Sequence, residues 1–365
     1  MATLRGLKRH SPNDVEAYCL LVHLRSQEAD AKRIASLGQL TDEAMPPKQR
    51  VHAWYAFGKM YDDTGENDAY FDAYASGASH RRRYLKYAVA QDEAIMQAIT
   101  DTFTDAWCAE TASVNQGKGM TFIVGMPRSG TTLVEKLLGS HHGVAMGGEL
   151  NAFSSAMMTE VAKREKPGSV HDAIARAASC DVAAMGQRYL TAVSGYRQEN
   201  TMLTDKLPLN FLYLGLIHKA LPQARIIHVE RQPMDTLWSV YKHLFTHAYP
   251  FSYNLEEIAG YYSAYRRLMT HWQTLLGDRI LNVSYEALVA GPTAETRRIT
   301  NFCDIPYDPA CLNFYQRETQ VTTGSAVQVR QPVNDRSVGQ WKRFSSQLAG
   351  VRDTLIGTGL LDESI

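Results

Sequence analysis

The sequence predicts an α/β fold, in which a parallel sheet is flanked by helices and preceded by an α-helical N-terminal extension. From residue 121 onward, short apolar segments rich in β-branched residues alternate with longer segments whose apolar positions recur at helical spacing. Between about residues 13 and 103, the pattern is helical and no segment has clear strand character. Because parallel sheets bind ligands at the carboxyl ends of their strands, we expect the functional residues there.

The N-terminal extension contains one recognisable sequence pattern. We expect residues 1–115 to form the helical region and residues 116–365 to form the α/β domain. Within the first part, Trp54, Phe57, Gly58 and Tyr61 match the start of a tetratricopeptide repeat, with phenylalanine in place of the usual leucine. One degenerate repeat cannot bury its own apolar face, so we expect it to pack against the rest of the chain. The region either recognises an acceptor or partner or extends the structure.

The individual elements of the α/β domain follow from the same periodicities. Strands are expected over residues 121–124, 144–146, 202–204, 225–229 and 280–283. Helices are expected to begin at residue 131 and to cover parts of 151–193, then 209–220, 234–245 and 255–276. The polar segment 322–344 contains several basic residues and is expected to be a loop over a ligand.

The turn after the first strand has the spacing of a phosphate-binding loop. Gly125 and Gly130 bound the turn, and Thr131 and Thr132 open the helix that follows. Glycines let the backbone approach an anion, which the first amides of the helix and the helix dipole then stabilise. An ordinary glycine-containing turn would not also need a loop arginine and two threonines. The sequence therefore predicts a P-loop-type α/β domain that binds a phosphorylated ligand.

One substitution separates this loop from that of a nucleoside triphosphatase. Thr131 stands where such enzymes carry the lysine that reaches the β- and γ-phosphates, and Arg128 provides a cation inside the loop instead. A nucleotide without a γ-phosphate therefore fits the loop better. Ser129, which follows Arg128, adds a hydroxyl to the same turn.

A second phosphate-binding pattern follows the strand over residues 225–229. Arg231 stands at the end of that strand, and Ser239 lies two turns into the next helix. A guanidinium and a hydroxyl in these places can both reach a phosphate at the sheet edge. An arginine after a strand is by itself more often a surface ion pair, but here it follows the first motif, at the end of a later predicted strand.

Together the two motifs resemble those of sulfotransferases that use 3′-phosphoadenosine-5′-phosphosulfate (PAPS). The segment from Pro127 to Thr132 is similar to their 5′-phosphosulfate loop, and Arg231 with Ser239 is similar to their 3′-phosphate motif. The arginine inside the loop resembles the tyrosylprotein sulfotransferases and the bacterial sulfotransferases with tetratricopeptide-like repeats. The resemblance covers about residues 121–342.

The resemblance assigns further roles. It makes Glu149 the general base, for which the alternative is a helix-start carboxylate, and makes Lys206 and Arg128 the groups that stabilise the leaving group. The donor contacts that the resemblance implies are Arg128, Ser129, Gly130, Thr131, Thr132, Arg231, Ser239, Tyr285, Ser325 and Arg330. Gln331 stands where the tyrosylprotein enzymes carry lysine, so either Arg330 or Lys342 is expected to provide that charge.

The implied reaction transfers a sulfuryl group from PAPS to an acceptor hydroxyl by in-line displacement, leaving adenosine 3′,5′-bisphosphate. A base is needed because a phenol with a pKa of about 10 does not lose its proton unaided at neutral pH. The tyrosylprotein-like pattern favours a phenol or a peptidyl tyrosine, in a small molecule or a peptide. No metal requirement is expected. His141 and His142 are expected to be helix-end residues and not the base.

The composition argues against several other classes of protein. The chain has 365 residues, and 38 Lys and Arg balance 38 Asp and Glu, so a general nucleic-acid binder is not expected. No apolar run reaches the length of a membrane span. Five scattered cysteines without C-x-x-C spacing indicate reduced thiols and a cytoplasmic protein without a structural zinc.

Two other functions are possible from the sequence. A P-loop kinase or nucleoside triphosphatase is disfavoured by Thr131 and by the lack of an apparent metal-binding aspartate after the strand that ends before Glu230 and Arg231. A binding protein that docks a partner through the helical region is disfavoured because every expected catalytic residue is present. The sequence does not indicate the oligomeric state.

Overall fold

The computed structural model describes Val22, Gly38 and residues 40–109, 115–163, 168, 170–197, 201–245, 248–316 and 331–363. Within these residues the chain forms two compact units. The first comprises Met1–Val89, Leu237–Tyr261 and Gly339–Ile365, and the second comprises Ala90–Thr236 and Tyr262–Val338. The expected division at residue 115 is a different partition and stays a prediction. No helix in the described part of the chain has the length and apolar character needed to cross a bilayer.

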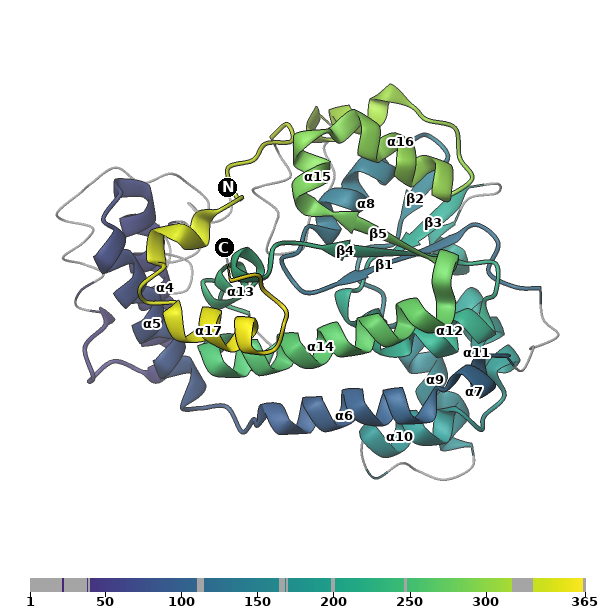
Figure 1. Ribbon diagram of the computed structural model, residues 1–365, viewed down its shortest axis with the longest axis horizontal. Helices are drawn as coiled ribbons and strands as arrows, with labels where there is room; N and C mark the ends of the chain where they lie inside the picture. Colours follow the sequence, from purple (N-terminus) through teal and green to yellow (C-terminus); the bar gives the residue numbers. More distant parts are fainter. Residues whose placement is uncertain are drawn as a thin grey trace, which may run out of the picture. The chain divides into compact units, whose positions relative to one another are not determined.

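The second unit is built on a five-stranded sheet with the strand order β2-β3-β1-β4-β5 (Figure 1). Every neighbouring pair is parallel. The strands are β1 (Met120–Gly125), β2 (Val144–Met146), β3 (Met202–Asp205), β4 (Arg225–Glu230) and β5 (Ile280–Ser284). All five expected strands are therefore confirmed, and so is the α/β fold class.

The two central strands of this sheet are buried along their whole length. Every residue of β1 and of β3 is buried, as expected for strands covered on both faces. The core on one side includes Ile123 and Val229 from the sheet and Val134 and Leu138 from the helix after β1. The parallel register places the carboxyl ends of β1, β3 and β4 at one edge, where the loops that carry the predicted site residues begin.

Helices cover both faces of this sheet. In Figure 1, α8, α15 and α16 lie on one side, and α9, α11 and α12 lie on the other. The α-helices of this unit are α6 (Val89–Thr102), α7 (Asp105–Ala109), α8 (Thr131–Gly139), α9 (Ala152–Ala162), α10 (Val170–Ala177), α11 (Val182–Val193), α12 (Leu214–Ala220), α15 (Tyr285–Ala290) and α16 (Pro292–Phe302). Its 3-10 helices are η1 (Ser194–Tyr196), η2 (Pro208–Tyr213), η4 (Gly277–Arg279) and η5 (Pro309–Gln316). The helix expected over 209–220 is thus a 3-10 segment followed by a short α-helix.

Two helices contribute to both units. They are α13 (Pro233–Tyr241) and α14 (Leu255–Leu276). The bounds of α14 match those expected, but α13 ends earlier than the expected Phe245. Beyond the end of the helix, the carbonyl of Phe245 accepts a hydrogen bond from the Tyr253 hydroxyl at 2.5 Å.

The first unit contains a helix pair and an aromatic core. The helices α4 (Pro47–Thr64) and α5 (Asn67–Arg82) are accompanied by η3 (Pro250–Tyr253), η7 (Gln340–Phe344) and α17 (Ala349–Gly357). The repeat-like pattern lies on α4, where a Cβ at Gly58 would stand 2.4 Å from the ring of Tyr74 on α5. Phe71 of α5 stacks on Trp238 with ring centroids 5.6 Å apart. In the described part of 322–344, η7 buries Trp341 and Phe344, so this part is not only a loop.

Candidate functional site

The loop between β1 and α8 has an unusual backbone. Gly125 has φ +153°, Arg128 has φ +68° and Gly130 has φ +110°. A Cβ at position 125 would stand 2.5 Å from the carbonyl oxygen of Val229, so only glycine lets the loop pass this close to β4. Arg128 adopts a left-handed conformation without being glycine, which concentrates backbone strain in the loop.

This loop leads into a helix whose N-terminus has no side-chain cap. Gly130 is the N-cap residue of α8 and no side chain accepts from the first amides there. Thr131 and Thr132 are buried in the first turn. The Ser129 hydroxyl oxygen is also buried and has no hydrogen-bond partner among the described residues. A helix N-terminus without a side-chain cap and an orphan buried hydroxyl beside it form a cradle that suits an anion.

Arg231 brings the second motif to this cradle. Its Nη1 donates a hydrogen bond to the carbonyl of Arg128 at 3.2 Å, and its Nη2 donates to the carbonyl of Ser337. Burial, reinforced by the nearby charge of Arg231, lowers the pKa of the Arg128 guanidinium to about 10. Two like charges held this close are unfavourable unless an anion lies with them. The two sequence-distant motifs therefore converge on one place.

Tyr285 connects the loop with this arginine. The guanidinium of Arg231 lies over the Tyr285 ring at 4.9 Å from its centroid, a cation–π arrangement. A Cβ at Gly130 would stand 2.7 Å from Cδ2 of the same ring. Tyr285 is the first residue of α15, and its position is set by the N-cap Ser284, whose Oγ accepts from the amide of Ala287 at 3.2 Å. The predicted tyrosine therefore lies between the two predicted motifs.

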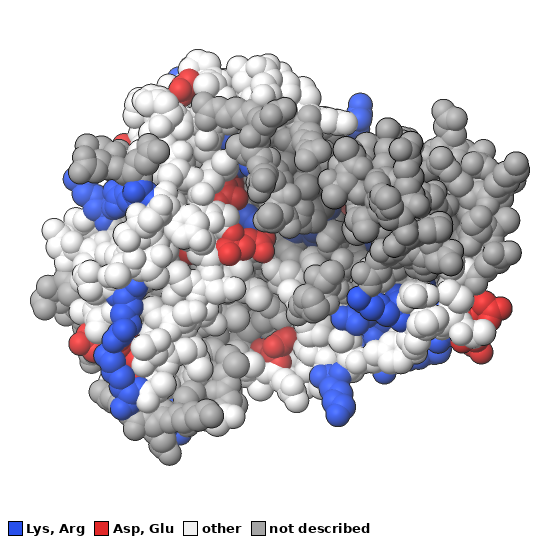
Figure 2. Space-filling model, turned by 180° about the vertical axis from the view of Figure 1, so that it is seen from behind, with Lys and Arg blue, Asp and Glu red and all other residues white. Residues whose placement is uncertain are grey.

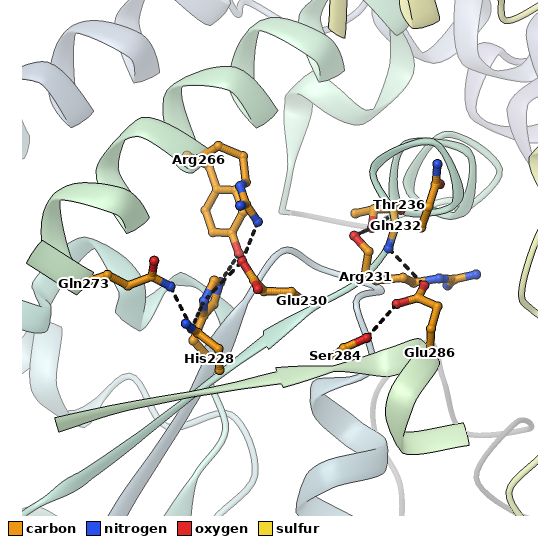
Figure 3. Close-up of polar contacts among 11 residues, drawn as sticks. His228, Glu230, Arg231, Gln232, Thr236, Arg266, Gln273, Ser284 and Glu286 are labelled. Atoms are coloured by element: carbon orange, nitrogen blue, oxygen red, sulfur yellow. Dashed lines mark hydrogen bonds and ion pairs between the residues drawn. The ribbon is translucent and has the colours of Figure 1, made fainter. Parts of the chain in front are cut away.

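Polar contacts fix the end of β4 on both sides of Arg231 (Figure 3). The amide of Gln232 donates to Glu286 at 2.9 Å, and Glu286 also accepts from the hydroxyl of Ser284 at 3.1 Å. On the other side, Arg266 and Glu230 form an ion pair at 2.5 Å. These contacts occupy the carboxylates next to Arg231, so its side chain keeps its direction toward the loop.

The other predicted donor residues either belong to the first unit or lie outside the described residues. Ser239 is buried in the part of α13 that belongs to the first unit. Lys342 is exposed in η7, which also belongs to the first unit. Ser325 and Arg330 lie outside the described residues. Their proposed contacts with a donor stay predictions.

The predicted base and the predicted leaving-group lysine form an ion pair. Lys206 Nζ donates to Glu149 Oε1 at 2.6 Å. The Lys206 side chain is 1% exposed and that of Glu149 is 43% exposed, so the pair has one buried and one open end. The helix α9 begins after the N-cap Asn151, and the Glu149 carboxylate is paired with the lysine. The open carboxylate can exchange a proton with a bound ligand while the lysine stays desolvated.

Two buried carboxylates that sequence reasoning missed lie beside this pair. Glu135 on α8 accepts from the amide of Gly148 at 3.0 Å. Asp205 at the end of β3 accepts from the hydroxyl of Tyr189 at 3.0 Å and from the side-chain amide of Asn210 at 3.2 Å. Burial raises the pKa of both, to about 7 for Asp205. A signal existed for Glu135, because it lies among apolar residues in a helix expected to pack on a buried sheet.

His141 and His142 follow the end of α8, as expected. Together with Asp308 they bring possible metal-ligand atoms within 4.8 Å of one another, the one such group found among the described residues. Nδ1 of His141 accepts a hydrogen bond from the amide of Gly143 at 3.0 Å. That nitrogen therefore already has a hydrogen-bond partner. Among the described residues, no contact is recorded between this cluster and the loop after β1 or the Glu149–Lys206 ion pair.

The fold and the site thus define an α/β protein with an anion cradle and an adjacent carboxylate–lysine pair at one sheet edge. Comparison with known proteins identifies the family. Residues 121–309 match the model of the sulfotransferase family, and the chain therefore belongs to this family, whose members use PAPS.

The individual relatives are distant. An uncharacterised protein of Aquifex aeolicus (strain VF5) is 28% identical over 348 residues, which are 92% of this chain and 45% of that protein. A protein-tyrosine sulfotransferase of Drosophila melanogaster is 26% identical over 250 residues, 63% of this chain and 48% of that protein. The chain thus spans about half the length of these relatives. Among solved structures, the sulfotransferase domain from the Synechococcus PCC 7002 olefin synthase is similar with a TM-score of 0.48 and 20% identity over 64% of this chain and 90% of that one.

Proposed function

We propose that this protein transfers a sulfuryl group from PAPS to the hydroxyl group of an acceptor. The observation that carries the proposal is the convergence of Arg231 and Tyr285 on the loop that contains Arg128. Two cations and an uncapped helix N-terminus at one place form a site for an anion with more than one charged group. Membership of the sulfotransferase family supports the same donor.

The residues present fit this donor. The amides of Gly130, Thr131 and Thr132 and the orphan hydroxyl of Ser129 would hold one phosphate group, and Arg231 would hold another with Tyr285 beside it. When bound, PAPS supplies an activated sulfuryl group with an anionic phosphate as its leaving group. Ser239, Ser325 and either Arg330 or Lys342 are proposed to complete the contacts.

The ion pair supplies the proton chemistry in this proposal. Glu149 takes the proton of the acceptor hydroxyl, because its carboxylate is the open end of the pair. Lys206, whose ammonium is buried and already oriented, provides positive charge where negative charge develops. Arg128 adds a second cation from the loop. None of these groups needs a metal to perform its part, and none is proposed.

The proposed acceptor is a phenol, in a small molecule or as a tyrosine of a peptide. Two features support this class: the loop arginine resembles that of the tyrosylprotein enzymes, and several relatives carry the name protein-tyrosine sulfotransferase. A labelled-donor assay against phenols, alcohols, sugars and tyrosine peptides, read by mass spectrometry, would identify the acceptor.

Calorimetry tests the donor class directly. Adenosine 3′,5′-bisphosphate should bind without added metal and more tightly than ATP. Tighter binding of ATP in the presence of magnesium would replace the proposal with the kinase or nucleoside triphosphatase alternative. A second assay distinguishes an enzyme from a binding protein: an enzyme transfers sulfate from labelled PAPS to an acceptor, whereas a binding protein does not.

Glu149→Gln tests the base. The variant should lose turnover by about 100-fold or more, the usual loss when a general base is removed, while adenosine 3′,5′-bisphosphate still binds. Glu295→Gln, which changes a surface carboxylate paired with Arg298 on α16, is the matched control and should keep full activity. Unimpaired turnover of Glu149→Gln would show that another group accepts the proton.

A further inference from the structure

Gly148 lies at the centre of the contacts that hold the Glu149 turn. Its amide donates to Glu135 Oε1 at 3.0 Å, and its carbonyl accepts from the backbone amide of Lys206 at 2.9 Å. The φ of Gly148 is +69°, a left-handed value that favours glycine. Both backbone polar groups of Gly148 are thus hydrogen-bonded, the carbonyl to the residue after β3 and the amide to a side chain of α8.

Glu135 is placed to do more than satisfy one amide. The side chain is buried, 4% exposed, and its Oε1 also accepts from the hydroxyl of Thr204 at 3.3 Å. Burial raises its pKa, while the positive charge of Lys206 and the amide of Gly148 act in the opposite direction. Lys206 is thus ion-paired with the open Glu149 and also acts electrostatically on the buried Glu135.

The other charged groups near Glu135 come from each element packed around it. Lys136 lies next to it on α8, and burial lowers the pKa of that lysine. Asp205 precedes Lys206 at the end of β3, and its pKa is raised by burial and by the charge of Glu135. Together with Glu149 and Lys206, these groups form one coupled cluster of three carboxylates and two ammonium groups.

We infer that Glu135 is a positioning residue that fixes the Gly148 turn, and hence Glu149, and leaves a negative charge near Lys206 when Glu149 becomes neutral. The inference rests on the proposed function. When the acceptor proton moves to Glu149, the carboxylate partner of Lys206 loses its charge. Glu135 then remains as a negative charge near the buried ammonium group of Lys206 at the step in which that positive charge acts.

Two substitutions separate the parts of this role. Glu135→Gln keeps the size and one acceptor oxygen but removes the charge. Glu135→Asp keeps the charge but moves the carboxylate away from Gly148. Glu160→Gln is the matched control, because Glu160 is a buried carboxylate of α9 that is paired with Lys163 and Arg188 and touches no site residue. Thermal melting first shows that each variant is folded.

The readout is kcat and KM for a phenol acceptor as a function of pH. Glu135→Gln should lower kcat about 10- to 100-fold with the KM for donor unchanged, since a misplaced base costs turnover more than donor binding. Both limbs of its pH profile should move by about one unit to lower pH, because removing a negative charge disfavours the protonated forms of the groups beside it. Glu135→Asp should lower kcat without moving the limbs, and Glu160→Gln should change neither.

If the pH profile of Glu135→Gln has the same limbs as that of the wild type, the charge role is wrong. If the kcat of Glu135→Gln equals that of Glu160→Gln, the positioning role is wrong. If Glu135→Gln does not fold, a wild-type kcat in Glu135→Asp overturns the positioning role by itself. Failure of the proposed function is separate, because the wild-type protein would then transfer no sulfate from labelled PAPS to any acceptor.

Discussion

Asp205 offers the most direct test of the electrostatics at the sheet edge. Its side chain is fully buried and accepts hydrogen bonds from Tyr189 and Asn210. Replacing it with asparagine removes the charge and keeps the shape. The Oδ1 atom of Asn210 is buried and has no partner among the described residues, so the new amide has an acceptor for its NH₂ group once the Asn210 amide turns over. The substitution should therefore be tolerated.

The sign and the size of the effect follow from the pKa. Burial raises the pKa of Asp205 from 3.8 to about 7, so the folded state holds its proton more tightly than the unfolded state. The resulting stability is complete below about pH 4, falls as pH rises, and is lost above about pH 7. Between pH 5 and pH 8 the wild type should lose about 2 to 3 kcal/mol of unfolding free energy through this group, whereas Asp205→Asn should not.

Urea unfolding of both proteins at pH 5 and pH 8 measures this difference. The unfolding free energy of Asp205→Asn relative to the wild type should rise by that amount between the two pH values. Asp278→Asn, which alters an exposed aspartate of η4, controls for the general loss of one negative charge and should show no such change. Equal pH dependence in the wild type and Asp205→Asn would refute the argument that burial controls this carboxyl group.

Substitutions at three positions test close packing, two in the candidate site and one in the helix pair of the first unit. Gly130→Ala should destabilise the protein by about 1 to 3 kcal/mol and weaken binding of adenosine 3′,5′-bisphosphate, because its Cβ would meet Tyr285 at 2.7 Å and its φ is +110°; unchanged binding by calorimetry would contradict this. Tyr285→Ala should weaken that binding by about 0.5 to 2 kcal/mol through loss of the contact with Arg231, whereas Tyr285→Phe should not, and equal losses in both variants would point to the hydroxyl instead. Gly58→Ala should lower the unfolding free energy by about 1 to 3 kcal/mol, since its Cβ would lie 2.4 Å from Tyr74, and an unchanged melting temperature would show that the helix pair adjusts.

The sheet could be predicted from sequence because each strand is a short apolar run, after which the apolar positions change to helical spacing. The residues from Thr121 to Val124 have side chains that only a covered strand buries, and Leu133, Val134 and Leu137 then recur on a helix. The end of α13 was not predictable from its own residues. Beyond that end, the Phe245 carbonyl accepts a hydrogen bond from Tyr253, a contact between residues that the helical pattern does not indicate.

Residues of the candidate site could be predicted where they belong to a sequence motif. Those whose role depends on tertiary contacts were missed. Arg128, Arg231 and Tyr285 were named from their motifs, and the structure brings them together. Glu135 has no motif of its own, and a carboxylate next to a lysine on a helix usually faces solvent. Its place among apolar residues of α8 indicates burial, but its contacts with Thr204 and the Gly148 amide come from tertiary structure. Charges on the face shown in Figure 2 give no such guide, because both signs are present among the described residues there.

The position of Glu135 also explains how one helix can serve both halves of the proposed chemistry. The N-terminus of α8 faces the anion cradle, and Glu135, one turn further along, holds the turn that carries Glu149. A helix is stiff over such a short distance, since every residue between is fixed by backbone hydrogen bonds. The distance between the candidate anion cradle and the proposed base is therefore set largely by the geometry of α8. Proximity of this kind is the part of catalysis that a pre-formed scaffold can supply before any ligand binds.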